Sequence, residues 1–343
     1  MSPTTAPKTE GGPELVSGPS FEQLTIGQRF DSAPAVTLTN GQAALHQAIL
    51  GDRLRLPLDH GLATAVTGTS PLAHPALVWN MAIGQSTLAT HHVIANLFYR
   101  GLVLRRFPHL GDTLRTTTEV VGLRQNRVRE GRPPTGLVAL RVTTVDQHDR
   151  PVLGFWRCAM LPLADAPAGS GPDDDLDSIG SEASDEQMGE AVSGWDVGTF
   201  RDRVPGPHFD LGMAGRRLRL ATGDVVSSAP ELARLTLNIA AVHHEAPAGG
   251  QRLVYGGHTI GLAMAQVCRA LPNLVTVTGW HGCDHTGPVH EGDTLTSEIQ
   301  IERAVPIGAG GGLVHLRVLT DARAANSERS RPVLDWRLVG VLA

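Results

Sequence analysis

Polar and apolar residues alternate along several stretches of this chain, which is the pattern of strands with one buried and one exposed face. The stretches form two series of three, at 110–123, 137–147 and 151–163 and again at 291–305, 313–323 and 332–343. A Gly-Asp-Thr-Leu turn stands at the start of each series, at 111–114 and at 292–295. The pattern predicts two antiparallel sheets, one in each half of the chain.

An apolar stretch of helical spacing precedes each series of strands. It reads LAHPALVWNMAIGQ at 72–85 and YGGHTIGLAMAQV at 255–267, and a histidine stands near both starts, His74 and His258. Because the apolar face of a strand needs a cover, each half is expected to be a sheet of about four strands wrapped around one central helix. The predicted fold class is therefore α+β.

The two halves are copies of one repeat. Both end on a strand with a Trp-Arg pair, Trp156-Arg157 and Trp336-Arg337. These pairs are expected to pack on their strands, with the arginine stems covering apolar surface. Two copies in one chain can pair their sheets edge to edge without a partner.

The rest of the chain divides around these copies. We predict a disordered tail at 1–20, a first repeat at 21–163, a linker at 164–208 and a second repeat at 209–343. The linker is acidic and rich in Gly, Pro and Ser, so it is expected to be exposed.

Composition is that of a globular protein, with 41% hydrophobic and 18% charged residues among 343. The formal charge of −5, without a Lys/Arg run, argues against binding to nucleic acid. Three separated cysteines (Cys158, Cys268 and Cys283) predict neither a disulfide framework nor a thiolate zinc site, and a reducing cytoplasm is the expected location. We expect no signal peptide and no membrane span.

Side chains that can transfer protons gather before the second central helix. Asn238, His243, His244 and Glu245 precede the Gly-Gly-His turn at 256–258. On a continuous helix, positions 238 and 243 would point roughly 140° apart, so they converge only if a helix ends between them.

Pro247 and the following Gly-Gly pair predict that this helix ends near 243–246. Asn238 is then expected on its last turn and His243 in the turn beyond. The apolar positions of the helix share one face and are expected to be buried: Leu232, Leu235, Ile239 and Val242.

The turn that opens the second central helix is a candidate site for negative charge. Unpaired N–H groups at a helix N-terminus can hold an enolate oxygen, and glycine permits close approach of a thioester. Gly257, His258 and Thr259 are the candidate donors, and the residues alone do not choose among them. The His258 side chain is expected to be structural.

A second histidine cluster, WHGCDH at 280–285, invites a metal hypothesis. Alternation along a strand would place His281, Cys283 and His285 on one face. Their spacing of two matches no familiar zinc pattern, and the counterpart NLFYRGL at 96–102 has no metal ligand. No metal is predicted, and this strand is expected to border the active site.

The order of these motifs resembles the double hot-dog enzymes of the MaoC-like dehydratase superfamily, over 21–163 and 209–343. HHVIANLFYRGLVLRR at 91–106 and LTLNIAAVH at 235–243 carry the resemblance, together with the GDTL turn and the Gly-Gly-His helix. The mesaconyl-CoA hydratase branch looks most similar. The resemblance implies a hydro-lyase for a short enoyl-CoA, with coenzyme A as part of the substrate and no other cofactor.

R-specific enoyl-CoA hydratases of this superfamily usually carry an Asp five residues before the catalytic His. Asn238 stands at the Asp position and His243 at the His position. The resemblance therefore implies that His243 is acid and base and that Asn238 orients water. His244 and Glu245 would support this pair, and His244 is kept as an alternative base.

The first repeat has lost this pair, because Asp52 is followed five residues later by Pro57. We expect a degenerate copy in which Asp52 is a turn residue. Two other interpretations stay open, a non-catalytic acyl-CoA-binding protein and a thioesterase. A thioesterase would want a carboxylate on the central helix, where 258–270 has none. A homodimer is compatible with these features.

Overall fold

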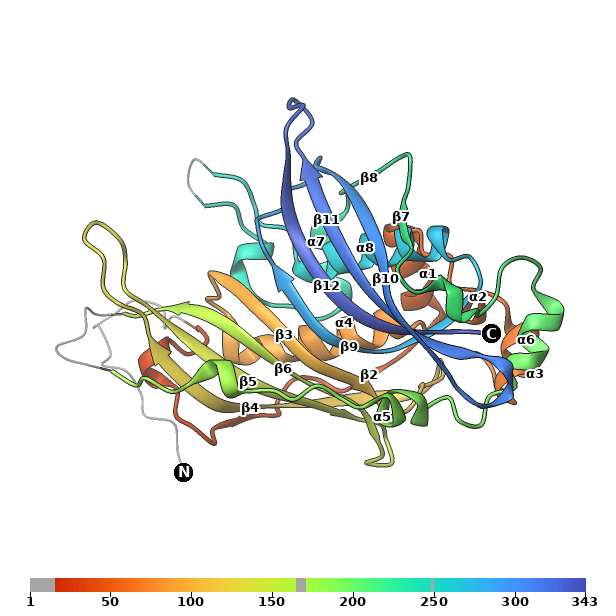
Figure 1. Ribbon diagram of the computed structural model, residues 1–343. Helices are drawn as coiled ribbons and strands as arrows, with labels where there is room; N and C mark the ends of the chain where they lie inside the picture. Colours follow the sequence, from red (N-terminus) through yellow and green to blue (C-terminus); the bar gives the residue numbers. More distant parts are fainter. Residues whose placement is uncertain (1–15, 165–170, 248–249) are drawn as a thin grey trace.

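The computed structural model describes residues 16–164, 171–247 and 250–343 (Figure 1). The predicted tail at 1–20 lies outside the described residues as far as residue 15, and 16–20 form no regular element. Within the described residues, no helix is both long enough and apolar enough to cross a membrane.

Long antiparallel strands of both halves join in one sheet (Figure 1). The first half has the order β4 (Thr113–Gln125), β5 (Thr135–Val145), β6 (Pro151–Pro162) and β3 (Ala95–Leu104). The second half continues with β9 (Leu274–His285), β12 (Ser330–Leu342), β11 (Gly312–Arg323) and β10 (Thr294–Pro306). Short strands pair with β4 and β10: β1 (Arg29–Phe30), β2 (Val36–Thr37), β7 (Arg217–Arg219) and β8 (Asp224–Val225). The predicted antiparallel sheets are confirmed.

The halves join at β3 and β9, where Tyr99 lies opposite Cys283 in antiparallel register. Behind this junction three tryptophans from α4, β9 and β12 are fully buried: Trp79, Trp280 and Trp336. Their ring centroids lie 4.9 Å apart for Trp79 and Trp280 and 5.4 Å apart for Trp280 and Trp336, both edge to face. The two halves therefore share one core.

Each half of the sheet carries one central helix, α4 (Pro75–Gln85) or α8 (Gly256–Ala270), as predicted. Every residue of α4 is buried, and α8 is buried from Gly257 to Cys268. The other helices lie outside this layer: α1 (Asn40–Leu50), α2 (Arg55–Leu58), α3 (His60–Thr67), α5 (Asp185–Glu190), α6 (Val197–Arg203) and α7 (Ala229–Leu235).

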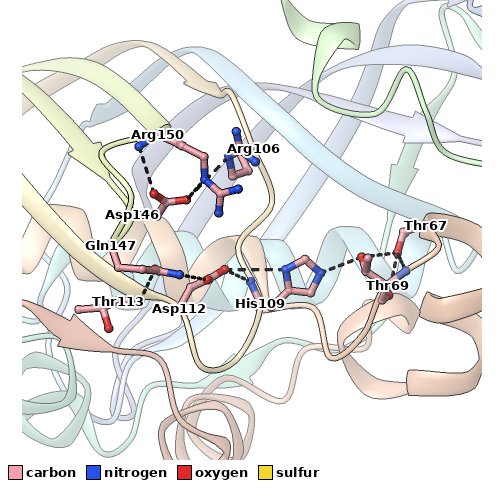
Figure 2. A network of polar contacts seen from close by, with 9 residues as sticks. All are labelled: Thr67, Thr69, Arg106, His109, Asp112, Thr113, Asp146, Gln147 and Arg150. Atoms are coloured by element: carbon pink, nitrogen blue, oxygen red, sulfur yellow. Dashed lines mark hydrogen bonds and ion pairs between the residues drawn. The ribbon is translucent and has the colours of Figure 1, made fainter.

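The repeated Gly-Asp-Thr-Leu turns have a structural role. In the first turn the Asp112 carboxylate accepts a hydrogen bond from His109 N at 2.7 Å, and in the second Asp293 accepts one from His290 N at 3.0 Å. Figure 2 shows that Asp112 also accepts the side-chain amide of Gln147, from the connection between β5 and β6. The aspartate closes its own turn and fixes it to the neighbouring hairpin.

The described part of the predicted linker, 171–208, is largely exposed but more ordered than a linker needs to be. This part forms η3 (Leu176–Ser178), α5 and α6, and Leu176, Met188 and Phe200 are buried. Gly279 of β9 makes room for it, because a Cβ there would come within 2.5 Å of Met188 Sδ. Although most residues of this segment are polar, the burial of its few apolar side chains is enough to hold it against the sheet.

Candidate active site

The chain leaves α7 three residues before Asn238. Leu237 takes a φ of +57°, which ends helical geometry. Gly84 of α4 permits this path, because a Cβ on Gly84 would lie 1.7 Å from the Thr236 carbonyl oxygen. The prediction that a helix ends between Asn238 and His243 is wrong in its position, because α7 ends at Leu235, before both residues. The prediction that Asn238 lies on its last turn is wrong, because the helix ends upstream of the proline and glycines that were expected to end it.

A short turn, η5 (Ala241–His243), then carries His243. The expected buried stripe holds for Leu232, which is fully buried, but Ile239 is 43% exposed. Ile239 lies beyond the helix, so helical spacing no longer decides which way it points.

The loop around Asn238 is fixed by three hydrogen bonds. Asn238 N donates to Ala233 O at 2.9 Å, and its Oδ1 accepts from Ala240 N at 2.9 Å. Its carbonyl oxygen lies 2.5 Å from His244 Nε2, which donates to it. The side chain is 3% exposed and lines a cavity. Since Oδ1 already accepts a backbone N–H, the NH₂ group is the part of the carboxamide that is free to meet a ligand.

His243 lines the same cavity. Its Nδ1 lies 3.1 Å from Leu253 O, and because a carbonyl can only accept, Nδ1 carries the proton and Nε2 has a free lone pair. Burial lowers the pKa of His243 to about 4. At neutral pH the imidazole is therefore uncharged and able to accept a proton.

The cavity measures about 310 Å³ and lies between the two halves. The first half contributes Thr87, Tyr99 and Arg157, and the second contributes His243 and Tyr255. Ile94, Thr286 and Pro288 are exposed at its mouth, whereas its deepest side chains are at most 3% exposed: Ile83, Thr87, Tyr99, Arg157, Asn238, Tyr255 and Thr259.

The first residues of α8 form one wall of the cavity. Gly256 and Thr259 line it, and Gly256 and Gly257 stand at the first helical positions, where N–H groups have no intrahelical acceptor. His258 N already donates to Tyr255 O at 2.9 Å. Of the three predicted donors, His258 is thus removed by its own hydrogen bond, and Gly256 was missed. The His258 ring is fully buried, in keeping with the structural role expected for it.

His244 and Glu245 lie on the other side of the loop. Both are exposed and border a separate surface hollow, not the cavity that holds His243. His244 supports Asn238 through its hydrogen bond to the Asn238 carbonyl, as expected of a supporting residue. The geometry favours His243 over His244 as the base.

The strand at 280–285 does not put its three candidate ligands on one face. A β-bulge lies between Trp280 and Gly282, so His281 turns to the outer face, where its Nε2 lies 3.0 Å from His315 Nδ1. Cys283 is buried in the core and His285 lines the cavity. Among the described residues, no group of three His, Cys, Asp or Glu side chains is placed to hold a metal ion.

His285, which the sequence analysis considered only as a possible metal ligand, is a second imidazole that lines the cavity. Its Nε2 is buried and has no hydrogen-bond partner within the described residues. It lies beside the start of α8, because a Cβ on Gly256 would come within 2.5 Å of it. Burial, and to a lesser degree the nearby His243, lower the pKa of His285 to about 4. The sequence contained a signal for this inward position, because His285 stands two residues after the buried Cys283 on the same strand, and such residues share a face.

The prediction for the Trp-Arg pairs is wrong in the first half. Arg157 is 3% exposed and lines the cavity, while Trp156 is only partly buried. In the second half Trp336 is buried and Arg337 is exposed. The same dipeptide is therefore turned over between the copies, so the likeness of sequence did not predict the face.

The counterpart of the site in the first half is closed. Asp52 is 2% exposed, accepts from Leu54 N at 2.7 Å, and lies 3.2 Å from His74 Nε2. It is a turn residue, as predicted. Leu50 packs where a Cβ of Gly261 would lie, within 2.6 Å. Side chains of the protein itself therefore fill the position that corresponds to the active-site cavity.

Two hot-dog repeats joined edge to edge, with an Asn-His pair in a cavity between them, define a double hot-dog protein of the hydratase type. No protein-family model matches the chain. Over 317 residues, 88% of each protein, the chain is 30% identical to β-methylmalyl-CoA dehydratase of Chloroflexus aurantiacus. It therefore belongs to the MaoC-like hydratase and dehydratase family, whose members are hydro-lyases.

Further comparisons agree. The chain is 27% identical over 312 residues to mesaconyl-CoA hydratase of Cereibacter sphaeroides, covering 88% of this chain and 89% of that protein. A conserved hypothetical protein of Mycobacterium tuberculosis with a double hot-dog fold is 57% identical, with a TM-score of 0.89 and coverage of 95% and 99%. A putative MaoC domain dehydratase of Chloroflexus aurantiacus shares the fold, at 24% identity, a TM-score of 0.79 and coverage of 96% and 99%.

Proposed function

We propose that the chain adds water to, or removes it from, a short enoyl-CoA thioester, with His243 as the single acid and base. What carries this proposal is the hydrogen bond from His243 Nδ1 to Leu253 O, which leaves Nε2 unprotonated on a residue that lines the cavity. A neutral imidazole whose other nitrogen is held by a carbonyl is suited to take a proton from water.

In the proposed reaction the thioester oxygen accepts hydrogen bonds from Gly256 N and Gly257 N at the start of α8. The helix terminus favours the negative charge that develops there. Asn238 donates from its NH₂ group to the water and holds it beside His243. His243 Nε2 removes a proton from the water as oxygen bonds to the β-carbon, and it returns that proton to the α-carbon on the same face. The enzyme ends in its starting protonation state, and no cofactor is consumed.

Branched C4 or C5 dicarboxylyl thioesters of the mesaconyl-CoA and β-methylmalyl-CoA type are the first candidates, because the curated relatives carry these names. Simpler enoyl-CoA thioesters are the second. A thioesterase is disfavoured, since no Asp or Glu is among the residues that line the cavity. The homodimer and the cytoplasmic location stay predictions, and light scattering measures the first.

The test is the absorbance of the conjugated thioester with purified protein and a panel that includes mesaconyl-CoA and crotonyl-CoA. Wild type is expected to consume the enoyl band, and His243→Ala to lose about 10³-fold in kcat, the usual value of a general acid and base. His244→Ala tests the alternative base, and it is expected to lose much less activity, because it removes only one hydrogen bond to the Asn238 loop.

Absence of turnover of every thioester by wild type, with CoA esters still bound, would leave a non-catalytic acyl-CoA-binding protein. Release of free thiol without loss of the double bond would make the chain a thioesterase instead.

A further inference from the structure

Arg157 is a buried cation for which the described part of the chain provides no anionic partner. Its NH1 donates to Ser86 Oγ at 2.8 Å and its NH2 to Thr90 Oγ1 at 2.7 Å, both uncharged acceptors. Its Nε is buried and has no hydrogen-bond partner, and among the described residues no carboxylate lies within ion-pair distance of it. A guanidinium has five N–H donors, so most of its capacity is unused. A buried guanidinium without an anionic partner lowers the stability of the folded protein, unless a bound anion pairs with it.

Its counterpart in the second half shows the ordinary alternative. Arg337 is exposed on the outer face and lies 3.8 Å from Glu302. In the first half the strand is turned so that the arginine points inward, next to Tyr99 on the neighbouring strand. An inward arginine that brings no carboxylate with it is what a site for an anionic ligand requires.

Arg157 belongs to the buried part of the cavity, with Tyr99 and Asn238. It is 3% exposed, whereas the mouth is formed by the exposed residues Ile94, Thr286 and Pro288. The pKa of His243 is lowered mainly by burial, and to a smaller degree by His244 and then by the charge of Arg157. Arg157 and the proposed base line one cavity, so one ligand can contact both. The phosphates of coenzyme A belong at the mouth, so they cannot be the anion that Arg157 meets.

We propose that Arg157 is the specificity-determining residue of this site and binds a carboxylate on the acyl group of the substrate, at the end away from the thioester. This inference rests on the proposed function. The planar guanidinium can donate two parallel hydrogen bonds to a carboxylate while it keeps its bonds to Ser86 and Thr90. The first repeat, which has lost its own Asn-His pair, thus supplies the recognition of the substrate that the second repeat converts.

Binding of unreactive thioesters tests this without turnover. Titration calorimetry compares methylsuccinyl-CoA, which has the second carboxylate and no double bond, with butyryl-CoA, which lacks the carboxylate. Wild type is expected to bind methylsuccinyl-CoA about 100-fold more tightly, as for a desolvated charge pair. Arg157→Met is expected to abolish this preference, Arg157→Lys to restore part of it, and Arg337→Met, the matched control, to retain it.

Two results would overturn the assignment. Wild type without a preference for methylsuccinyl-CoA would do so even if Arg157→Met failed to fold. Equal losses for both esters in Arg157→Met would also do so, because they would mean a general effect on the site. Failure of the proposed function looks different, since selective binding would then persist while mesaconyl-CoA stayed unhydrated.

Discussion

His243 and His285 face one cavity, and burial lowers the pKa of each to about 4. Each positive charge would also repel the other, so the site holds at most one proton on the pair with ease. A proton that His243 takes from water is therefore strongly driven to leave again. In the proposed reaction its destination is the α-carbon of the substrate.

This burial predicts the pH dependence of activity. Because the pKa of His243 is lowered and its neutral form is the active one, kcat/KM is expected to stay level from pH 8 downward and to fall only near pH 4. The measurement is kcat/KM against pH, with circular dichroism at each pH to confirm folding. A fall centred near the ordinary value of about 6.5 would contradict the neutral, buried base.

At this scale the sequence predicted that Asn238 and His243 come together, and both line one cavity, although α7 ends before the breakers on which that prediction depended. It did not predict the inward position of Arg157, because the shared Trp-Arg dipeptide suggested one orientation for both copies. Alternation within the strand held the answer, since Arg157 has the parity of the buried Phe155 and Ala159. The alternation of side chains within its own strand decides which face a residue takes, whereas sequence similarity to the other repeat does not.

At the scale of elements, the site depends on the contact between α4 and the loop after α7. Helices, strands and the joined sheets were predictable because their patterns are long. The end of α7 was not, because the close approach of Gly84 to Thr236 joins segments that are far apart in sequence. The bulge at His281 is a second case, since neighbouring strands impose it.

Gly84→Ala tests this contact. Helix propensity alone would stabilise the protein by about 1 kcal/mol, but a Cβ 1.7 Å from the Thr236 carbonyl oxygen must push the Asn238 loop away. We expect lower stability in urea unfolding, by about 2 kcal/mol, together with a loss of activity. Gly189→Ala in α5, where a Cβ meets nothing within 4 Å, is the control. Equal stabilisation of both variants would refute the role of the contact.

At the scale of the whole molecule, the two halves share a core that contains several imidazoles. His46 and His258 lie fully buried between the central helices and α1, and burial lowers their pKa values to about 3 and about 4. Both rings are uncharged in the folded protein near neutral pH. Protonation would place a charge in the buried interior, where within the described residues the His258 ring has no hydrogen-bond partner and the His46 ring is hydrogen-bonded only to Asn80, so both rings stay neutral while the protein is folded.

The stability of the protein is therefore expected to depend on pH. Above about pH 6.5 these imidazoles are neutral in both folded and unfolded chains and contribute nothing. Between about pH 6.5 and pH 4 the unfolded chain binds protons that the folded one does not, so the free energy of unfolding falls. Urea titrations across this window measure the slope.

Matched variants identify the residue that causes this pH dependence of the free energy of unfolding. His258→Leu is expected to flatten the slope, because both ring nitrogens of His258 lack partners in the core. His60→Leu, at an exposed position of α3, is expected to leave it unchanged. The same slope in all three proteins would assign the dependence to other groups.

The inverted Trp-Arg pair has a genetic consequence. In a dimer of identical hot-dog chains, every mutation is present twice, and an arginine turned inward at one site is turned inward at the other. Fusion of the two copies removes that constraint, so a single gene can keep Arg157 inside and Arg337 outside. Mutations can then favour one acyl pocket without having to fit a second one, and divergence of the copies becomes a route to new substrates.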